Sequence, residues 1–355
     1  MCHVIFGSCF FDRFRQISLT VASSMNKSRP VSRRVALGVV AAVTLGAAAP
    51  FSRATAYPER PVRIVVPFAP GAGTDSIGRL IASKLGESLG ASFVVENRTG
   101  ASGAIGAQAV AQSPADGHTL LLAAAPFTTV PAALPSAGYD PLVHFAPVGM
   151  FATGPLVWAV GQQVPVTKLQ DLIALAKQRP GVLNYGSAGV GGINHLVLEL
   201  FKVRTGTFIT HIPYRGIAPA TLDAMSGQIQ LVTGTIPALA PLIRDGRLRA
   251  LAVTSARRSP ALPHVPSMVE AGLADFDVLN YFALMAPRGT PDTVVAQLNA
   301  GLERIVRLPD VQARLNADAL EPATGSPEAL ARFLRQDFDG WKDVVRRQGL
   351  KIDAL

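Results

Sequence analysis

The sequence predicts an α/β protein with two domains, each built around a mainly parallel sheet, and three observations lead to this fold class. Short β-branched runs alternate with helical patterns along the chain, which is the order of βαβ units. Of the 355 residues, 49% are apolar and only 16% are charged, so the chain can bury a large core. Its length is also sufficient for two domains.

The first βαβ units are expected between residues 62 and 124. The helix pattern here places apolar residues three and four positions apart, whereas the strand runs are short and almost wholly apolar. Strands are predicted at Val62–Pro67, Phe93–Glu96 and Thr119–Ala124, and helices at Ile77–Leu89 and Ala104–Gln112.

The rest of the chain repeats this order and then ends in helices. Strands are predicted at 156–160, 183–186, 209–212, 229–233, 251–254 and 278–286, and helices at 169–178, 193–204, 218–225, 293–308, 311–315 and 327–349. So many strands need two sheets, and we place the chain's crossings between them near Pro155 and near Asn280. The predicted domains are residues 57–155 together with 281–355, and residues 156–280.

Residues 1–56 have the pattern of an export leader. From Met25, a basic start precedes an apolar run at Val35–Ala49, and the small residues Ala54 and Ala56 follow. The run has 15 residues, fewer than the roughly 20 of a membrane-spanning helix, so we expect cleavage after Ala56 and a periplasmic protein. Arg33-Arg34 leaves twin-arginine and ordinary export both open. Residues 1–24 fit no leader pattern, which makes Met25 a candidate start.

Charge and cysteine content exclude several classes of partner. The formal net charge is +9, but residues 1–56 hold seven basic residues and one Asp, so the mature chain keeps only about +3. No nucleic-acid partner is therefore expected. Both cysteines, Cys2 and Cys9, lie in the leader, and the histidines lack metal-ligand spacing. We expect no metal and no cofactor.

Two glycine-rich loops are the strongest candidates for a binding site. One runs from Pro67 to Asp75 and the other from Asn184 to Gly192, and each connects a predicted strand to a helix. Glycines let a loop turn its amides inward, and free amides at a helix N-terminus bind anions without a cationic side chain. Two such loops facing each other across a cleft could hold a short dicarboxylate, or a carboxylate and a second polar group.

Two further features near these loops receive a structural interpretation. The run from Arg98 to Gly106 spaces small residues three apart, which favours close packing. His195 follows the second loop on a helix face, where a buried structural histidine is expected more often than a ligand contact.

Enzyme motifs are incomplete. A nucleophile elbow around Ser187 would need glycine at Tyr185, and a dinucleotide pattern from Gly189 breaks at Asn194. No acid–base pair stands out, so no catalytic residue is assigned and no enzymatic activity is expected. A secreted hydrolase that uses Ser187 stays an open alternative.

Seven ordered segments together resemble a known family. They are Tyr57–Pro61, Val65–Gly71, Val94–Arg98, Ser113–Leu121, Leu183–Ser187, His211–Gly216 and Leu248–Thr254. The mature chain, residues 57–355, is similar to the extracytoplasmic solute receptors of tripartite tricarboxylate transporters, the Bug receptors. This resemblance implies a type II periplasmic-binding-protein fold with a hinge and a Venus-flytrap cleft. It also implies a monomer that captures a small organic carboxylate for membrane permease subunits. Delivery to a membrane sensor is the alternative.

The resemblance also implies the residues of the cleft. The first loop would supply Phe68, Ala69, Gly71, Ala72, Gly73, Thr74 and Asp75, the second loop Ser187, Ala188, Gly189 and Gly192, and a third segment Tyr214 and Arg215. Backbone amides and waters would hold the carboxylates, which agrees with the absence of arginine from both loops.

Several positions depart from the family pattern. Ala72, Thr99, Ser102 and Gly192 stand where glycine, proline, glycine and serine are usual. Ala124–Thr128 replaces a polar stretch, and Gly234 replaces a frequent aspartate. We therefore add Phe127, Thr128 and Gly234 to the cleft and expect it to be less polar, with an apolar or aromatic part of the ligand near Phe127.

Overall fold

The computed structural model describes residues 57–71 and 73–349, so the predicted leader and Ala72 lie outside the described residues. In chain order the elements are β1 Val62–Val66, α2 Gly73–Leu89, β2 Phe93–Asn97, η1 Ala101–Gly103, α3 Ala104–Ala111, β3 Thr119–Ala124, α4 Pro126–Ala133, η2 Pro135–Ala137, β4 Phe145–Gly161, α5 Leu169–Gln178, β5 Asn184–Ser187, α6 Ile193–Thr205, β6 Thr210–Pro213, α7 Ile217–Ser226, β7 Leu231–Thr235, α8 Ile236–Arg244, β8 Leu248–Val253, β9 Leu279–Pro287, α9 Asp292–Ile305, α10 Pro309–Ala317, β10 Glu321–Pro322 and α11 Pro327–Gln348.

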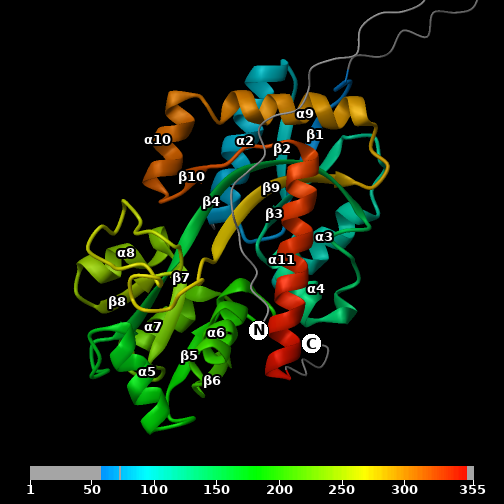
Figure 1. Cartoon of the computed structure of the whole chain (residues 1–355). Helices are drawn as coiled ribbons and strands as arrows, with labels where there is room; N and C mark the ends of the chain where they lie inside the picture. The colour runs from blue at the N-terminus through cyan, green and yellow to red at the C-terminus, as the bar shows by residue number, and fades with distance from the viewer. Residues whose placement is uncertain (1–56, 72, 350–355) are drawn as a thin grey trace, which may run out of the picture. The chain divides into compact units, whose positions relative to one another are not determined.

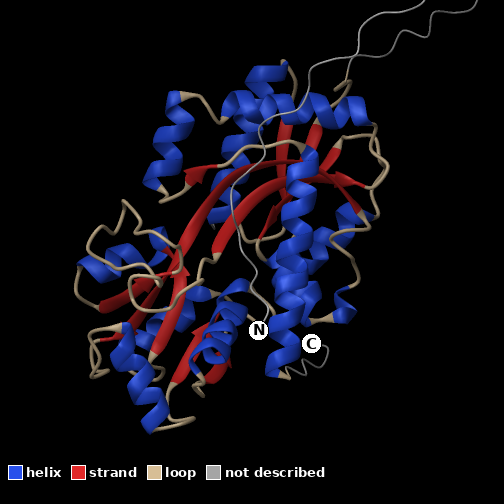
Figure 2. Cartoon of the chain, viewed as in Figure 1, coloured by secondary structure: helices blue, strands red, loops and turns tan. Residues whose placement is uncertain are grey.

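The described strands form two sheets that share the long strand β4 (Figure 2). Strands β2, β1 and β3 are parallel neighbours, and so are β7, β5 and β6. Between these groups, β9 and β4 run antiparallel to their neighbours, and β8 and β10 also pair with β4. The predicted α/β class is confirmed, and the two parallel groups are joined by antiparallel strands.

Strand β4 changes partners between Pro155 and Leu156. Its first part pairs with β9 as far as Pro155, and Leu156–Val160 pairs with β7. Proline has no amide to donate, so a ladder is easily exchanged beside it. The change lies where the sequence predicts a crossing. The division into two domains stays a prediction, because the described residues belong to one compact unit.

Local sequence explains how helices such as α2 join the core. Ile77, Ile81 and Leu85 are spaced four apart, and each is at most 1% exposed. This spacing puts them on one helix face, which packs with β1 in the same apolar cluster. Burying each such side chain contributes about 1.5–3 kcal/mol.

The helix α4 has no sequence signal that we could use, because Pro131 lies inside it and lowers its helix propensity. Its last seven residues, Phe127–Ala133, are nevertheless all buried. α11 lies along α4 and also contacts α6 (Figure 1). Tertiary packing therefore overrides local propensity here.

A buried polar network fixes α11 against α4. Thr128 donates to Asp337 at 2.6 Å and lies 3.1 Å from the Tyr281 hydroxyl, while Trp341 Nε1 donates to Asp337 at 2.9 Å. Burial raises the pKa of Asp337 to about 6, although both hydrogen bonds favour the charged carboxylate. The network thus connects α4, β9 and α11.

Among the described residues, no helix is both long enough and apolar enough to span a membrane.

Candidate functional site

The first glycine loop lies between β1 and α2 and is open to solvent. Ala69, Gly71 and Gly73 are exposed, and no atom lies within 4 Å of the place where a side chain at Gly71 or Gly73 would begin. Gly71 has φ +82°, a conformation that favours glycine. Phe68 is half-buried at the edge of this loop.

Asp75 holds the first loop from inside. It is 3% exposed and accepts hydrogen bonds from the Gly71 amide at 2.9 Å, Arg79 Nε at 3.0 Å and Asn97 Nδ2 at 2.8 Å. Burial alone would raise the pKa of this carboxyl, but the hydrogen bonds and the Arg79 charge hold the pKa at about 2. Asn97 also donates to the Phe68 carbonyl at 3.0 Å. Asp75 therefore orders the loop and occupies the Gly71 amide itself.

The second glycine loop, between β5 and α6, is held by uncharged groups. The Gly189 amide donates to Ser187 Oγ at 3.2 Å, and the Gly191 amide donates to His195 Nδ1 at 3.1 Å. Ser187 is fully buried, whereas Ala188 is exposed. Gly192 is the residue just before α6 and, as a glycine, provides no side-chain cap. The loop therefore captures two of its own amides and leaves the start of α6 uncapped.

An aromatic stack lies beneath this second loop. The rings of His195 and His211 are parallel, with centroids 4.0 Å apart, and Tyr185 stacks on His211 at 4.8 Å. His211 Nε2 lies 2.6 Å from Ser187 Oγ. Glu199 accepts from Tyr185 at 2.7 Å and from Lys202 at 2.8 Å, next to the stack. The sequence interpretation of His195 as a buried structural residue agrees with its 4% exposure.

Both imidazoles of the stack are kept neutral. Burial, with a smaller effect of Lys202, lowers the pKa of His195 to about 4. Burial together with His195 and Lys202 lowers the pKa of His211 to about 3, although Glu199 opposes this shift. A neutral imidazole can accept one hydrogen bond and donate another, which a protonated one cannot.

The short turn η1 connects the two loops, a role that sequence reasoning missed. Ser102 Oγ donates to the Val190 carbonyl at 3.3 Å, and a side chain at Gly103 would lie 3.4 Å from Phe68 and Pro67. Ser102 has φ +53°, where glycine is favoured, and such strain often marks functional sites. The departure from glycine at Ser102 was the available signal. Close packing is confirmed at Gly106, where a side chain would collide with Pro67.

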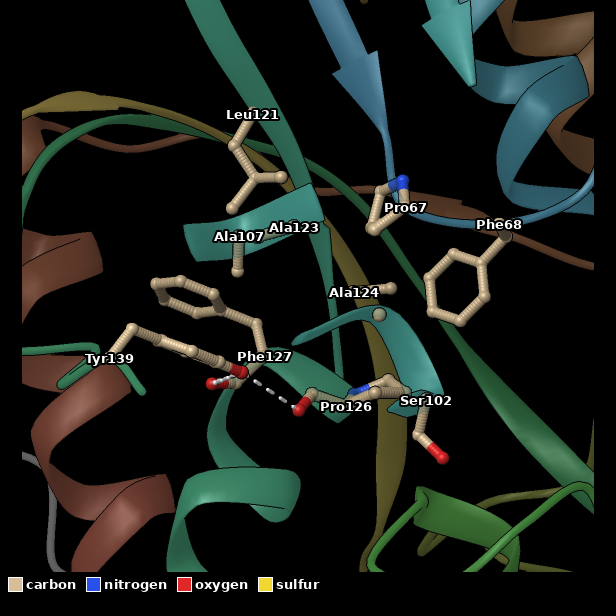
Figure 3. Close-up of a pocket in the computed structure, with 11 residues that line it drawn as sticks. Pro67, Phe68, Ser102, Ala107, Leu121, Ala123, Ala124, Pro126, Phe127 and Tyr139 are labelled. Carbon is tan, nitrogen blue, oxygen red and sulfur yellow. Dashed lines mark hydrogen bonds between the residues drawn. The ribbon is translucent and has the colours of Figure 1, made fainter. Parts of the chain in front are cut away.

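A small apolar pocket opens beside this turn (Figure 3). It has a volume of about 10 Å³, room for about one water molecule. Phe127 lines it, is 4% exposed and packs against Tyr139 and Phe145. The Tyr139 hydroxyl donates to the Phe127 carbonyl at 3.0 Å, so it is already occupied. The residues that line the pocket are Pro67, Phe68, Ser102, Gly103, Ala107, Leu121, Ala123, Ala124, Pro126, Phe127 and Tyr139.

Other residues expected in the cleft are engaged elsewhere. Thr128 is fully buried in the network with Asp337, and Gly234 is buried, where a side chain would crowd Leu239 at 3.2 Å. Tyr214 donates its amide to the Ser187 carbonyl at 3.1 Å, which places its backbone beside the second loop. Its hydroxyl donates to Asp223, and burial with this bond raises the pKa of Tyr214 to about 12. Arg215 is exposed.

Comparison with protein families identifies the family of this chain. The family model described as "Tripartite tricarboxylate transporter family receptor" matches residues 77–350. This chain belongs to that receptor family. BugT of Bordetella pertussis is 38% identical over 324 residues, which cover 91% of this chain and 99% of BugT.

Solved structures of similar receptors include one with adipate and one with bound malate. R. palustris Rpa4515 with adipate is 39% identical with a TM-score of 0.76, covering 82% of this chain and 98% of that one. MatC from Rhodopseudomonas palustris with bound malate is 32% identical with a TM-score of 0.74, covering 81% and 100%. The predicted family and the fold that it implies are therefore confirmed.

Proposed function

We propose that this receptor captures a small organic carboxylate in the periplasm and delivers it to the permease subunits of a tripartite transporter. The observation that carries this proposal is the pair of strand-to-helix glycine loops, which the Ser102 turn brings together through Phe68 and Val190. The acids bound by similar receptors, adipate and malate, support the ligand class. Delivery to a membrane sensor is the alternative use of the same binding step.

The carboxylates would be held by backbone amides. Within residues 57–71 and 73–349, the amides of Ala188 and Val190 donate to no protein acceptor. In the first loop, Gly73 and Thr74 begin α2, where the first amides have no intrahelical partner. The dipoles of α2 and α6 favour negative charge at these ends. Neither loop contains an arginine, so recognition does not depend on a fixed cation.

The carbon chain of the ligand would lie against the apolar pocket. Phe68 and Ala124 provide apolar walls there, and Ser102 adds a polar side chain to the lining. A cavity of about 10 Å³ is too small for an organic acid, so the walls must separate when the ligand enters. Phe127 would support this wall with the ring face that Tyr139 does not cover. We leave Thr128 and Gly234 out of the proposed contacts.

Entry and closure would follow the predicted domains. One predicted domain consists of residues 57–155 and 281–355, and the other of residues 156–280. Bending near Pro155 and Asn280 would move the two domains apart, and a bound acid would favour the closed state. Residues 1–56 would direct export and be cleaved near Ala56, and the mature receptor would act as a monomer.

A hydrolase that uses Ser187 is the candidate from another class, and one observation favours it. Ser187 Oγ lies 2.6 Å from His211 Nε2, as a nucleophile lies beside its base. However, Ser187 is fully buried and also contacts both the amide and the carbonyl of Gly189. All three contacts are satisfied when Ser187 donates to Gly189 and His211 donates to Ser187, an arrangement in which His211 cannot take the serine proton. We therefore propose a binding role and no catalysis.

A binding screen tests the proposal. The mature protein is titrated calorimetrically with succinate, malate, glutarate, adipate and benzoate, and its melting temperature is recorded with each acid. A bound acid at 100 times its dissociation constant adds about 2.7 kcal/mol to the free energy of unfolding. Because the pocket is apolar, succinate should bind more tightly than its hydroxylated counterpart, malate. A protein that none of these acids stabilises would contradict the proposed function, and turnover of an ester that Ser187→Ala abolishes would favour the hydrolase.

A further inference from the structure

The second loop owes its shape to two side chains that take up its own amides. Ser187 Oγ accepts from Gly189, and His195 Nδ1 accepts from Gly191, two residues further along. Between these captured amides lies Val190, whose carbonyl accepts from Ser102. The two captures therefore fix the amides that flank Val190 in sequence, those of Gly189 and Gly191.

His195 can accept from Gly191 in only one protonation state. Nδ1 must carry a lone pair, so the ring is neutral with its proton on Nε2. The burial of His195, at 4% exposure, favours that neutral form, since its pKa is lowered to about 4. The acceptor is therefore present throughout the neutral range.

The ring of His195 also has a fixed orientation. It stacks on His211 with an interplanar angle of 13° and a centroid distance of 4.0 Å, and His211 in turn lies within hydrogen-bonding distance of Ser187. One stack of rings thus supports both acceptors. A ring held in this way loses little further freedom when it accepts the Gly191 amide.

We propose that His195 is a positioning residue for ligand binding, which holds the Gly191 amide while Ser187 holds Gly189, so that the Ala188 and Val190 amides remain for the ligand carboxylate. The inference rests on the proposed function, because it assigns a cause to the loop conformation that binding requires. His195 itself does not contact the ligand. Its role differs from simple core packing, since it depends on one acceptor atom.

Two substitutions separate the acceptor from the packing. His195→Asn places Oδ1 near the position of Nδ1 and keeps an acceptor, whereas His195→Phe keeps a buried ring without one. His118→Phe is the matched control, because His118 is another buried histidine, 8% exposed, that contacts Tyr57 away from this loop. Each variant is first compared with the wild type by circular dichroism and melting temperature.

The first measurement needs no ligand. Amide hydrogen exchange at Gly191, followed by NMR, should accelerate about tenfold in His195→Phe, as expected for the loss of one hydrogen bond, and return close to the wild-type rate in His195→Asn. The control His118→Phe should leave this rate unchanged. Equal exchange at Gly191 in His195→Phe and the wild type would overturn the inference.

The second measurement is the affinity for succinate and adipate. Each acid that binds the wild type should bind His195→Phe about tenfold more weakly and His195→Asn within about threefold, because one hydrogen bond is lost and then restored. If His195→Asn binds the acid as weakly as His195→Phe does, this result would also contradict the acceptor role. If no acid binds the wild type, the proposed function fails, and amide exchange still decides whether His195 positions the loop.

Discussion

The two glycine loops have the same place after a strand and before a helix, but they are held by different chemistry. In the first, the charged carboxylate of Asp75 binds Gly71, Arg79 and Asn97. In the second, neutral Ser187 and His195 bind Gly189 and Gly191. Two loops with the same place between a strand and a helix can thus be stabilised by an anion or by uncharged acceptors. The difference should appear in how each loop responds to substitution and to acid.

The largest expected effect comes from removing the anion of the first loop. Asp75→Ala deletes three hydrogen bonds to a charged group and should lower the free energy of unfolding by about 3 kcal/mol, measured by urea unfolding at pH 7. Arg79 is 57% exposed and can return to water, which limits the loss. Glu87→Ala is the control, because its ion pair with Lys84 is exposed and screened by solvent and should contribute much less to stability. If the two substitutions lower the free energy of unfolding equally, the special role of Asp75 is contradicted.

As the pH is lowered, the second loop should lose stability before the first loop does. The folded pKa values of His195 and His211 lie below the unfolded value of about 6.5, so the unfolded state binds protons first. Their contribution is complete above pH 6.5 and falls as the pH drops through about 4, by about 1.4 kcal/mol per pH unit for each histidine. Asp337, whose pKa is raised, opposes this trend between about pH 6 and 4. Asp75, whose pKa is about 2, stays charged in this range.

Urea unfolding between pH 7 and pH 4.5 checks the sign. His195→Asn removes one of the two histidine contributions. Between pH 7 and pH 4.5, the free energy of unfolding of this variant should therefore decrease by about 2–3 kcal/mol less than that of the wild type. His118→Phe provides the comparison for loss of a histidine elsewhere. Parallel curves for His195→Asn and the wild type would show that His195 is not protonated on unfolding.

The smallest effect concerns the turn that connects the loops. Ser102→Gly and Ser102→Ala both remove the hydrogen bond to Val190, but only glycine relieves the left-handed backbone of residue 102. The glycine variant should therefore be about 1 kcal/mol more stable than the alanine variant, measured by urea unfolding. Both variants should bind succinate or adipate with similarly reduced affinity. An alanine variant as stable as the glycine variant would argue that this backbone is not strained.

Prediction succeeded where the signal is local. The helix at 169–178 has the predicted bounds, since its apolar residues recur with helical spacing and Asp171 in its first turn accepts from the Lys168 amide. Strand β3 also has the predicted bounds, as an apolar run buried throughout. The glycine loops lie between strand and helix as expected. Their assignment as ligand contacts stays a prediction.

Prediction was incomplete where distant segments meet. The pairing of β4 with β9 and β7 joins residues far apart in sequence, and no periodicity encodes which strands become neighbours. Ser102 donates to Val190, which lies 88 positions further along the sequence. The residues next to Ser102 in sequence therefore suggested close packing as its only role. Helix α4 forms despite the internal Pro131 because α11 covers it.

The sequence by itself determined the α/β class, the two loops, the family and the absence of arginine from the loops, because each depends on residue types at short spacing. Only the tertiary structure decided what holds each loop. Asn97 reaches Asp75 through the pairing of β1 and β2, and His211 reaches His195 through the pairing of β5 and β6. The physical reason is that burial and pKa shifts arise from neighbours in space, which strand order sets and local sequence does not specify.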